Sequence, residues 1–104
     1  MRVGRGRFHD VIDRQLDLFA ADAAPLIEEA DESDAAWTNA RAEESEELYG
    51  DYQLVCDALG ERLYELRETY ASSLDEGTAH EYRAAFNHAV RKRFRRFAAF
   101  LEDE

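Results

Sequence analysis

The sequence predicts an all-α protein, an elongated three-helix bundle. A long central helix forms an antiparallel hairpin with the C-terminal helix, and a shorter N-terminal helix packs alongside. Ala, Leu, Glu and Arg dominate the composition and favour helices, whereas proline occurs once and strand-forming residues are few. Apolar residues also recur at helical spacing in three segments. With 104 residues and 45% hydrophobic content, the chain is expected to form one helical domain, residues 1–104, around a modest core.

The first helix is predicted over residues 7–21, after a flexible basic tail at residues 1–6. At 100° per residue, its apolar side chains share one arc and its acidic residues lie opposite. The arc is formed by Phe8, Val11, Ile12, Leu16, Leu18 and Phe19. A short helical turn over residues 23–30 is predicted next. Asp22 can cap this turn, and Pro25 fits its start because an N–H there would have no helical partner.

The central helix is predicted over residues 34–73 and would be roughly 60 Å long. Its core-facing positions are spaced 4-3-4-4, an eleven-residue repeat that stays nearly in phase with a straight helix. These positions are Trp37, Arg41, Glu44, Leu48, Tyr52, Val55, Leu59, Leu63, Leu66, Tyr70 and Leu74. Gly50 and Gly60 lie off this stripe, where each costs about 1 kcal/mol relative to Ala. A break at Gly50 is the main structural alternative.

The third helix is predicted over residues 78–102. Thr78 and Glu81 form a capping-box pattern at its start, and apolar residues continue the same stepping toward the C-terminus. The second and third helices should form an antiparallel hairpin that folds about residue 76. This fold leaves residues 34–47 beyond the reach of the third helix, so Trp37 is expected on an incompletely covered surface.

A surface that mixes apolar and charged residues at that end indicates a partner, because monomers rarely leave a large aromatic stripe in water. A second copy is the simplest partner and would give an isologous homodimer. Another helical protein is an alternative, and a fold-back of residues 24–30 would remove the need for either. The predicted partner-facing residues are Trp37, Arg41, Glu44 and Leu48, together with Arg91 and Arg95 from a basic run that complements acids.

The net charge of −11 is unevenly distributed. Residues 28–51 hold ten acids and one base, whereas residues 83–96 hold six bases and no acid. The overall negative charge opposes nucleic acid and anionic lipid at long range, and no apolar run has the length of a membrane span. Cys56 is the only cysteine, so it is interpreted as a small core residue without a disulfide or zinc role. These features predict a cytoplasmic protein.

The acidic residues suggest an alternative function. Glu44, Glu47 and Asp51 are spaced i, i+3 and i+7, which places them within about a 60° arc of a helix. Carboxylate oxygens suit Mg²⁺, a hard ion. The stretch "EESEELYGD" resembles the second acidic motif of MazG-like all-α nucleoside triphosphate pyrophosphohydrolases, and "EEADE" resembles the first. The resemblance implies Mg²⁺-dependent hydrolysis of a nucleotide, although Asp51 follows Glu47 by four residues where the family motif has three.

The sequence as a whole favours contact over catalysis. It contains no Gly-rich phosphate loop after a strand, and no Ser/His/Asp grouping with local support. We therefore expect a small acidic helical protein that acts by protein–protein interaction or self-assembly, without a catalytic site or a cofactor.

Overall fold

The computed structural model describes residues 6–102, in which every regular element is helical. The elements are α1 (His9–Asp22), α2 (Ala24–Thr38), α3 (Ala42–Ala71), α4 (Glu76–Arg93), the 3₁₀ turn η1 (Arg95–Phe97) and α5 (Ala99–Glu102). The predicted all-α class is confirmed. None of the helices in this part of the chain combines the length and apolar character needed to cross a lipid bilayer.

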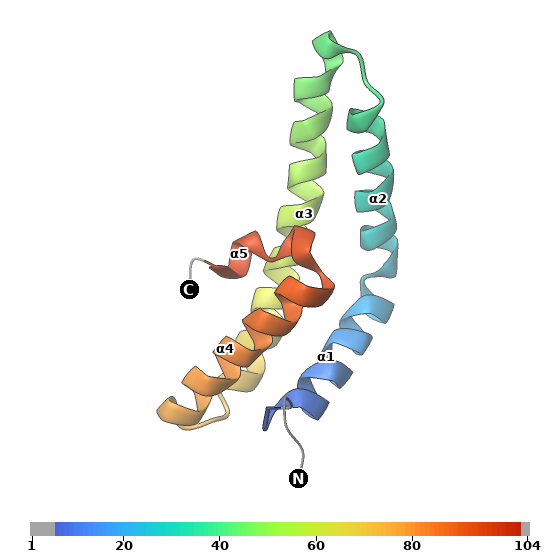
Figure 1. Ribbon diagram of the computed structural model, residues 1–104. Coiled ribbons are helices and arrows are strands. Elements are labelled where there is room, and N and C mark those ends of the chain that lie inside the picture. Colours follow the sequence, from blue (N-terminus) through green and yellow to red (C-terminus); the bar gives the residue numbers. More distant parts are fainter. Residues whose placement is uncertain (1–5, 103–104) are drawn as a thin grey trace.

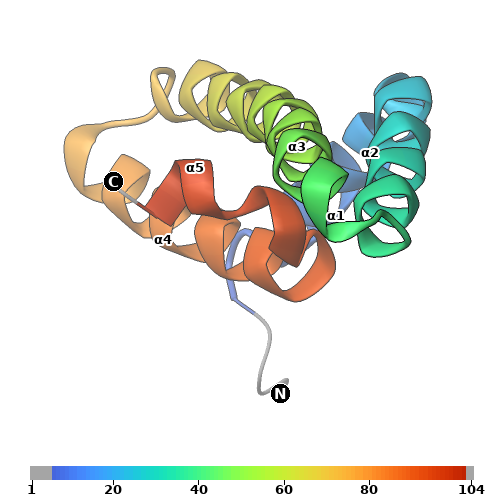
Figure 2. The same cartoon turned by 90° about the horizontal axis from the view of Figure 1, so that it is seen from above.

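The helices form an elongated bundle. Helix α2 runs antiparallel to the first half of α3, and α4 runs antiparallel to its second half (Figure 1). Helix α1 continues the line of α2 beside α4, while η1 and α5 cross α3 near its middle (Figures 1 and 2). The molecule measures 53 × 26 × 22 Å, and its radius of gyration of 15.8 Å exceeds the roughly 13 Å of a compact chain of this length. The predicted elongation and the α3–α4 hairpin are therefore present.

The predicted central helix is wrong at its N-terminal end. The chain reverses at residues 39–41, so the segment before it forms α2, a helix of 15 residues that replaces the predicted short turn. Leu26 and Ile27 on α2 pack against the core, and Ala30 is fully buried. A straight rod would leave this apolar face in water, so burial favours the reversal. Gly50 lies inside α3, and the helix continues through it.

The most buried row of α3 is displaced from the predicted stripe. Leu59 and Leu63 are fully buried as expected, but most other stripe positions are only half-buried. Small residues and one arginine complete the buried row, which consists of Cys56, Leu59, Gly60, Leu63, Arg67 and Ala71. The small residues let the C-terminal segments approach α3 closely.

Helix α4 begins two residues earlier than predicted, and Asp75 caps it. The Asp75 carboxylate accepts hydrogen bonds from the backbone N–H and the hydroxyl of Thr78, both at 2.9 Å. These bonds hold the pKa of Asp75 below its usual value. Glu81 instead accepts a hydrogen bond from Arg7 at 3.1 Å, so the predicted pairing of Thr78 with Glu81 does not form the cap.

The predicted third helix does not continue to residue 102. It ends at Arg93, and Phe94 leaves the helical conformation with φ −131° and ψ 54°. The break turns Phe97, Ala98 and Leu101 onto α3, where all three are buried. Their crossing point is Gly60, and a Cβ added there would lie 2.7 Å from the Phe100 Cβ and 2.9 Å from the Phe97 carbonyl oxygen. The absence of a side chain at Gly60 therefore permits this packing.

Candidate interaction surface

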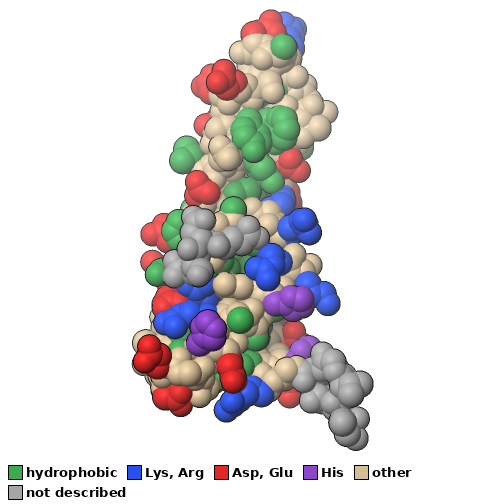
Figure 3. Space-filling model, turned by 60° about the vertical axis from the view of Figure 1, so that its left-hand side comes forward, with side chains coloured by type: hydrophobic (Ala, Val, Ile, Leu, Met, Phe, Trp, Pro, Cys, Tyr) green, Lys and Arg blue, Asp and Glu red, His purple; other side chains and the backbone are tan. Residues whose placement is uncertain are grey.

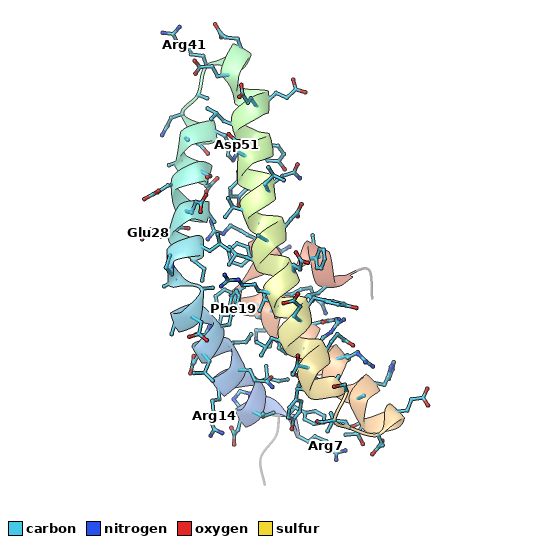
Figure 4. All side chains as sticks on the ribbon, turned by 180° about the vertical axis from the view of Figure 1, so that it is seen from behind. Arg7, Arg14, Phe19, Glu28, Arg41 and Asp51 are labelled. Carbon is cyan, nitrogen blue, oxygen red and sulfur yellow. The ribbon has the colours of Figure 1, made fainter. Side chains whose placement is uncertain are left out.

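Four of the predicted partner-facing residues lie at one end of the molecule. Trp37 is in the last turn of α2, Arg41 immediately precedes α3, and Glu44 and Leu48 are in the first two turns of α3. We call residues 37–52 the hairpin tip. It extends beyond α4, η1 and α5, which cover only the other half of α3 (Figures 1 and 2). Figure 4 shows Arg41 at the turn itself.

Trp37 is half-buried against its own chain. Its ring meets Tyr49 edge to face, with 4.9 Å between the ring centroids, and Tyr49 in turn lies 6.2 Å from Tyr52. The hydrophobic core and the residues packed on it reach Tyr52, while the Trp37–Tyr49 pair lies beyond them. Among the described residues, the buried indole N–H of Trp37 has no hydrogen-bond acceptor. Trp37 was expected on an incompletely covered surface, and this expectation is corrected in part, because the reversal before α3 sets Trp37 on α2 against Tyr49 on α3.

The neighbouring ring, Tyr49, remains 41% exposed. Leu48 is half-buried, whereas Arg41 and Glu44 are exposed. Hydrophobic side chains gather on the upper half of the molecule in Figure 3, where only α2 and the first half of α3 are present. The tip thus carries a small apolar patch bordered by acids.

At the base of the tip, Arg96 ties η1 to α2 and α3. Its guanidinium donates a 2.8 Å hydrogen bond to Asp31 on α2. It also hydrogen-bonds the Tyr52 hydroxyl, yet burial and the neighbouring Cys56 thiol raise the pKa of Tyr52. Burial likewise raises the pKa of Cys56, so this thiol stays protonated at neutral pH and behaves as a small core residue.

The basic run divides between internal ion pairs and solvent. Arg93 lies 2.7 Å from Asp17 on α1, and Arg96 pairs with Asp31 on α2. The acids that complement the run within the chain therefore come from α1 and α2. The predicted partner-facing residues Arg91 and Arg95 are exposed, as is Lys92. We call Arg91, Lys92 and Arg95 the basic edge, because they lie where α4 gives way to η1.

The carboxylates of the magnesium hypothesis point into solvent. Glu44, Glu47 and Asp51 are all exposed on α3. On α2, Glu28 is exposed and points away from α3 (Figure 4). In the part of the chain that the structure describes, no three His, Cys, Asp or Glu side chains form a group that could hold a metal ion. Mg²⁺ binding by these acids remains a prediction.

Sequence reasoning missed a buried charge network between α3 and α4. Arg67 is 0% exposed, donates to Asn87 at 2.9 Å and to Glu68 at 2.8 Å, and lies over the Tyr64 ring. Glu68 also accepts two 2.9 Å hydrogen bonds from Arg83. The hydrogen bond from Arg83 is the main reason that the pKa of Glu68 lies below its usual value. The sequence did hold a signal for the burial of Arg67, because this residue follows Leu63 by four positions and so lies on the same helix face.

These features fix the fold and leave the hairpin tip and the basic edge exposed. No protein-family model, no curated protein and no solved structure matches this chain.

Proposed function

We propose that this protein acts by protein–protein contact, with a second copy of itself as the partner. The Trp37–Tyr49 pair carries the proposal, because it is an apolar cluster outside the main core at the uncovered end of a helical hairpin. A partner that covers it would remove the exposed Tyr49 ring from water. A small shift at the contact could also supply an acceptor for the Trp37 N–H, whose burial without one costs about 1–3 kcal/mol.

The shape and charge of the chain support a second copy as the partner. At the tip the molecule consists of the end of α2 and the start of α3, and it is thicker where α4, η1 and α1 join the bundle (Figures 1 and 2). An isologous pair arranged tip to base would set the thin half of each copy against the thick half of the other. In that arrangement Arg91 and Arg95 of one copy approach the acids on α3 of the other. Such charge complementarity fixes the register of the two copies and raises their association rate more than it raises their affinity.

Sedimentation velocity across a concentration series tests this proposal. We expect a dimer for the wild type, and weaker association for the double variant Arg91→Glu/Arg95→Glu, since it places acids opposite acids. The matched control is Arg14→Glu/Arg62→Glu, which reverses two exposed arginines on α1 and α3 and changes the net charge equally. Trp37→Ala should also weaken association while far-ultraviolet circular dichroism still reports a helical protein.

Three outcomes would contradict the proposal. The wild type could sediment as a monomer at every concentration, or the control could weaken association as much as the basic-edge variant. Release of pyrophosphate from nucleoside triphosphates in the presence of Mg²⁺, abolished by Glu47→Gln, would instead establish the hydrolase alternative.

A further inference from the structure

A groove of about 600 Å³ runs between α1 and α4, on a different part of the molecule from the hairpin tip. Its volume falls in the range of about 300–1,000 Å³ that is typical of small-molecule sites. The residues that line it are Gly6, His9, Ile12, Asp13, Leu16, Ala84, Ala85, His88, Ala89, Lys92 and Arg93.

The floor of the groove is apolar, and the groove is hollow because short side chains on α4 face longer ones on α1. Ile12 and Leu16 on α1 are 3% and 1% exposed, so they belong to the core and present only their outer surfaces. Opposite them, α4 carries Ala84, Ala85 and Ala89, whose methyl groups do not fill the space between the helices. The result is a groove whose lining is mostly apolar.

The rim of the groove is basic at the end nearest the C-terminus of α4. Among the nearby carboxylates, Asp17 lies 2.7 Å from Arg93, which neutralises its charge, and Asp13 lies 3.5 Å from the His9 imidazole. Lys92 and His88 are exposed at the same rim. Figure 3 shows that Lys, Arg and His side chains gather on the lower half of the molecule, despite its negative net charge. This end of the groove is therefore suited to an anionic group.

We propose that the groove binds an amphiphile that has a single aliphatic chain and an anionic head. The chain would lie against Ile12, Leu16 and the alanines of α4, where each buried methylene is stabilised by the hydrophobic effect. The head, a carboxylate or a phosphate, would accept hydrogen bonds from the Lys92 ammonium and from His88. A charge-assisted pair of this kind gives the site its preference for anions.

Isothermal titration calorimetry with ligands of one chain length tests the proposal. Dodecanoate and dodecyl phosphate, at concentrations where both are monomeric, should give saturable one-to-one binding. The relative affinities of these two ligands identify the preferred head group. Dodecyltrimethylammonium has the same chain and the opposite charge, so it should bind at least about tenfold more weakly.

Two variants and one control assign the binding to this groove. Lys92→Glu should weaken dodecanoate binding at least about tenfold, because it replaces the ammonium with a repelling carboxylate. Ala84→Phe should abolish binding by filling the groove, and its exposed position keeps the fold intact. Arg14→Glu reverses an exposed charge on α1 outside the groove and should leave the affinity unchanged.

The proposal is overturned by any of three results. Neither anionic ligand gives saturable binding, the cationic ligand binds as tightly as dodecanoate, or Arg14→Glu weakens binding as much as Lys92→Glu. Because Lys92 also belongs to the basic edge, the self-association of Lys92→Glu is measured separately by the sedimentation experiment.

Discussion

The two glycines inside α3 should respond in opposite directions to substitution by alanine. Gly→Ala in a helix interior favours folding by about 1 kcal/mol when space is available, because alanine has the higher helix propensity. A Cβ at Gly50 would meet nothing within 4 Å. Gly50→Ala should therefore stabilise the protein by up to about 1 kcal/mol.

At Gly60 the new methyl group would collide with atoms that have little freedom to move. The two nearest are the Phe100 Cβ at 2.7 Å and the Phe97 carbonyl oxygen at 2.9 Å. Overpacking costs about 1–3 kcal/mol, and a rigid neighbour places this site in the upper half of that range. After the gain in propensity is subtracted, Gly60→Ala should destabilise the protein by about 1–2 kcal/mol.

Urea denaturation followed by circular dichroism measures both effects in one assay. We expect the transition midpoint of Gly60→Ala to fall and that of Gly50→Ala to rise, with similar slopes for both variants. If η1 and α5 both detach, the loss of stability also includes the burial of Phe97 and Leu101, which is worth about 1.5–3 kcal/mol for each side chain. Equal stabilisation by the two substitutions would refute the close approach of η1 and α5 to Gly60.

The buried network between α3 and α4 supports two further predictions. Arg67→Ala should lower the free energy of unfolding by about 2–5 kcal/mol, because it leaves a cavity in the core and removes the hydrogen-bond donor to Asn87, while Glu68 keeps its two hydrogen bonds from Arg83. Arg67→Met, which keeps most of the volume, should cost less in the same urea assay. The pKa of Glu68 in the folded protein lies below its usual value. The stabilisation that ionised Glu68 contributes is therefore complete when the pH is above the usual pKa, and it is lost as the pH falls through the folded-state pKa. Melting temperatures measured from neutral pH downward should therefore fall less steeply for Glu68→Gln than for the wild type, whereas a Glu65→Gln control on the exposed side of α3 should follow the wild type. An identical acid dependence in Glu68→Gln and the wild type would contradict the role assigned to Glu68.

The candidate surface was only partly accessible to sequence reasoning. Trp37 was placed at an uncovered end, and the tip does extend beyond α4, but Tyr49 of α3 covers part of the indole. The prediction of one straight helix missed this contact. Residues 34–47 have the same helix propensity whether they form part of one helix or of two helices joined by a turn. Asn39 was the only local hint, because asparagine is poor in helix interiors and common in turns.

The sequence alone determined that the chain is helical and where most of its helical segments lie. Helix propensity and apolar spacing are properties of neighbouring residues, so they are legible without coordinates. The tertiary structure alone decided the reversal at residues 39–41, the break at Phe94 and the burial of Gly60 and Arg67. Each of these depends on contacts between residues far apart in the chain, where burial and close packing outweigh the preference of any local segment.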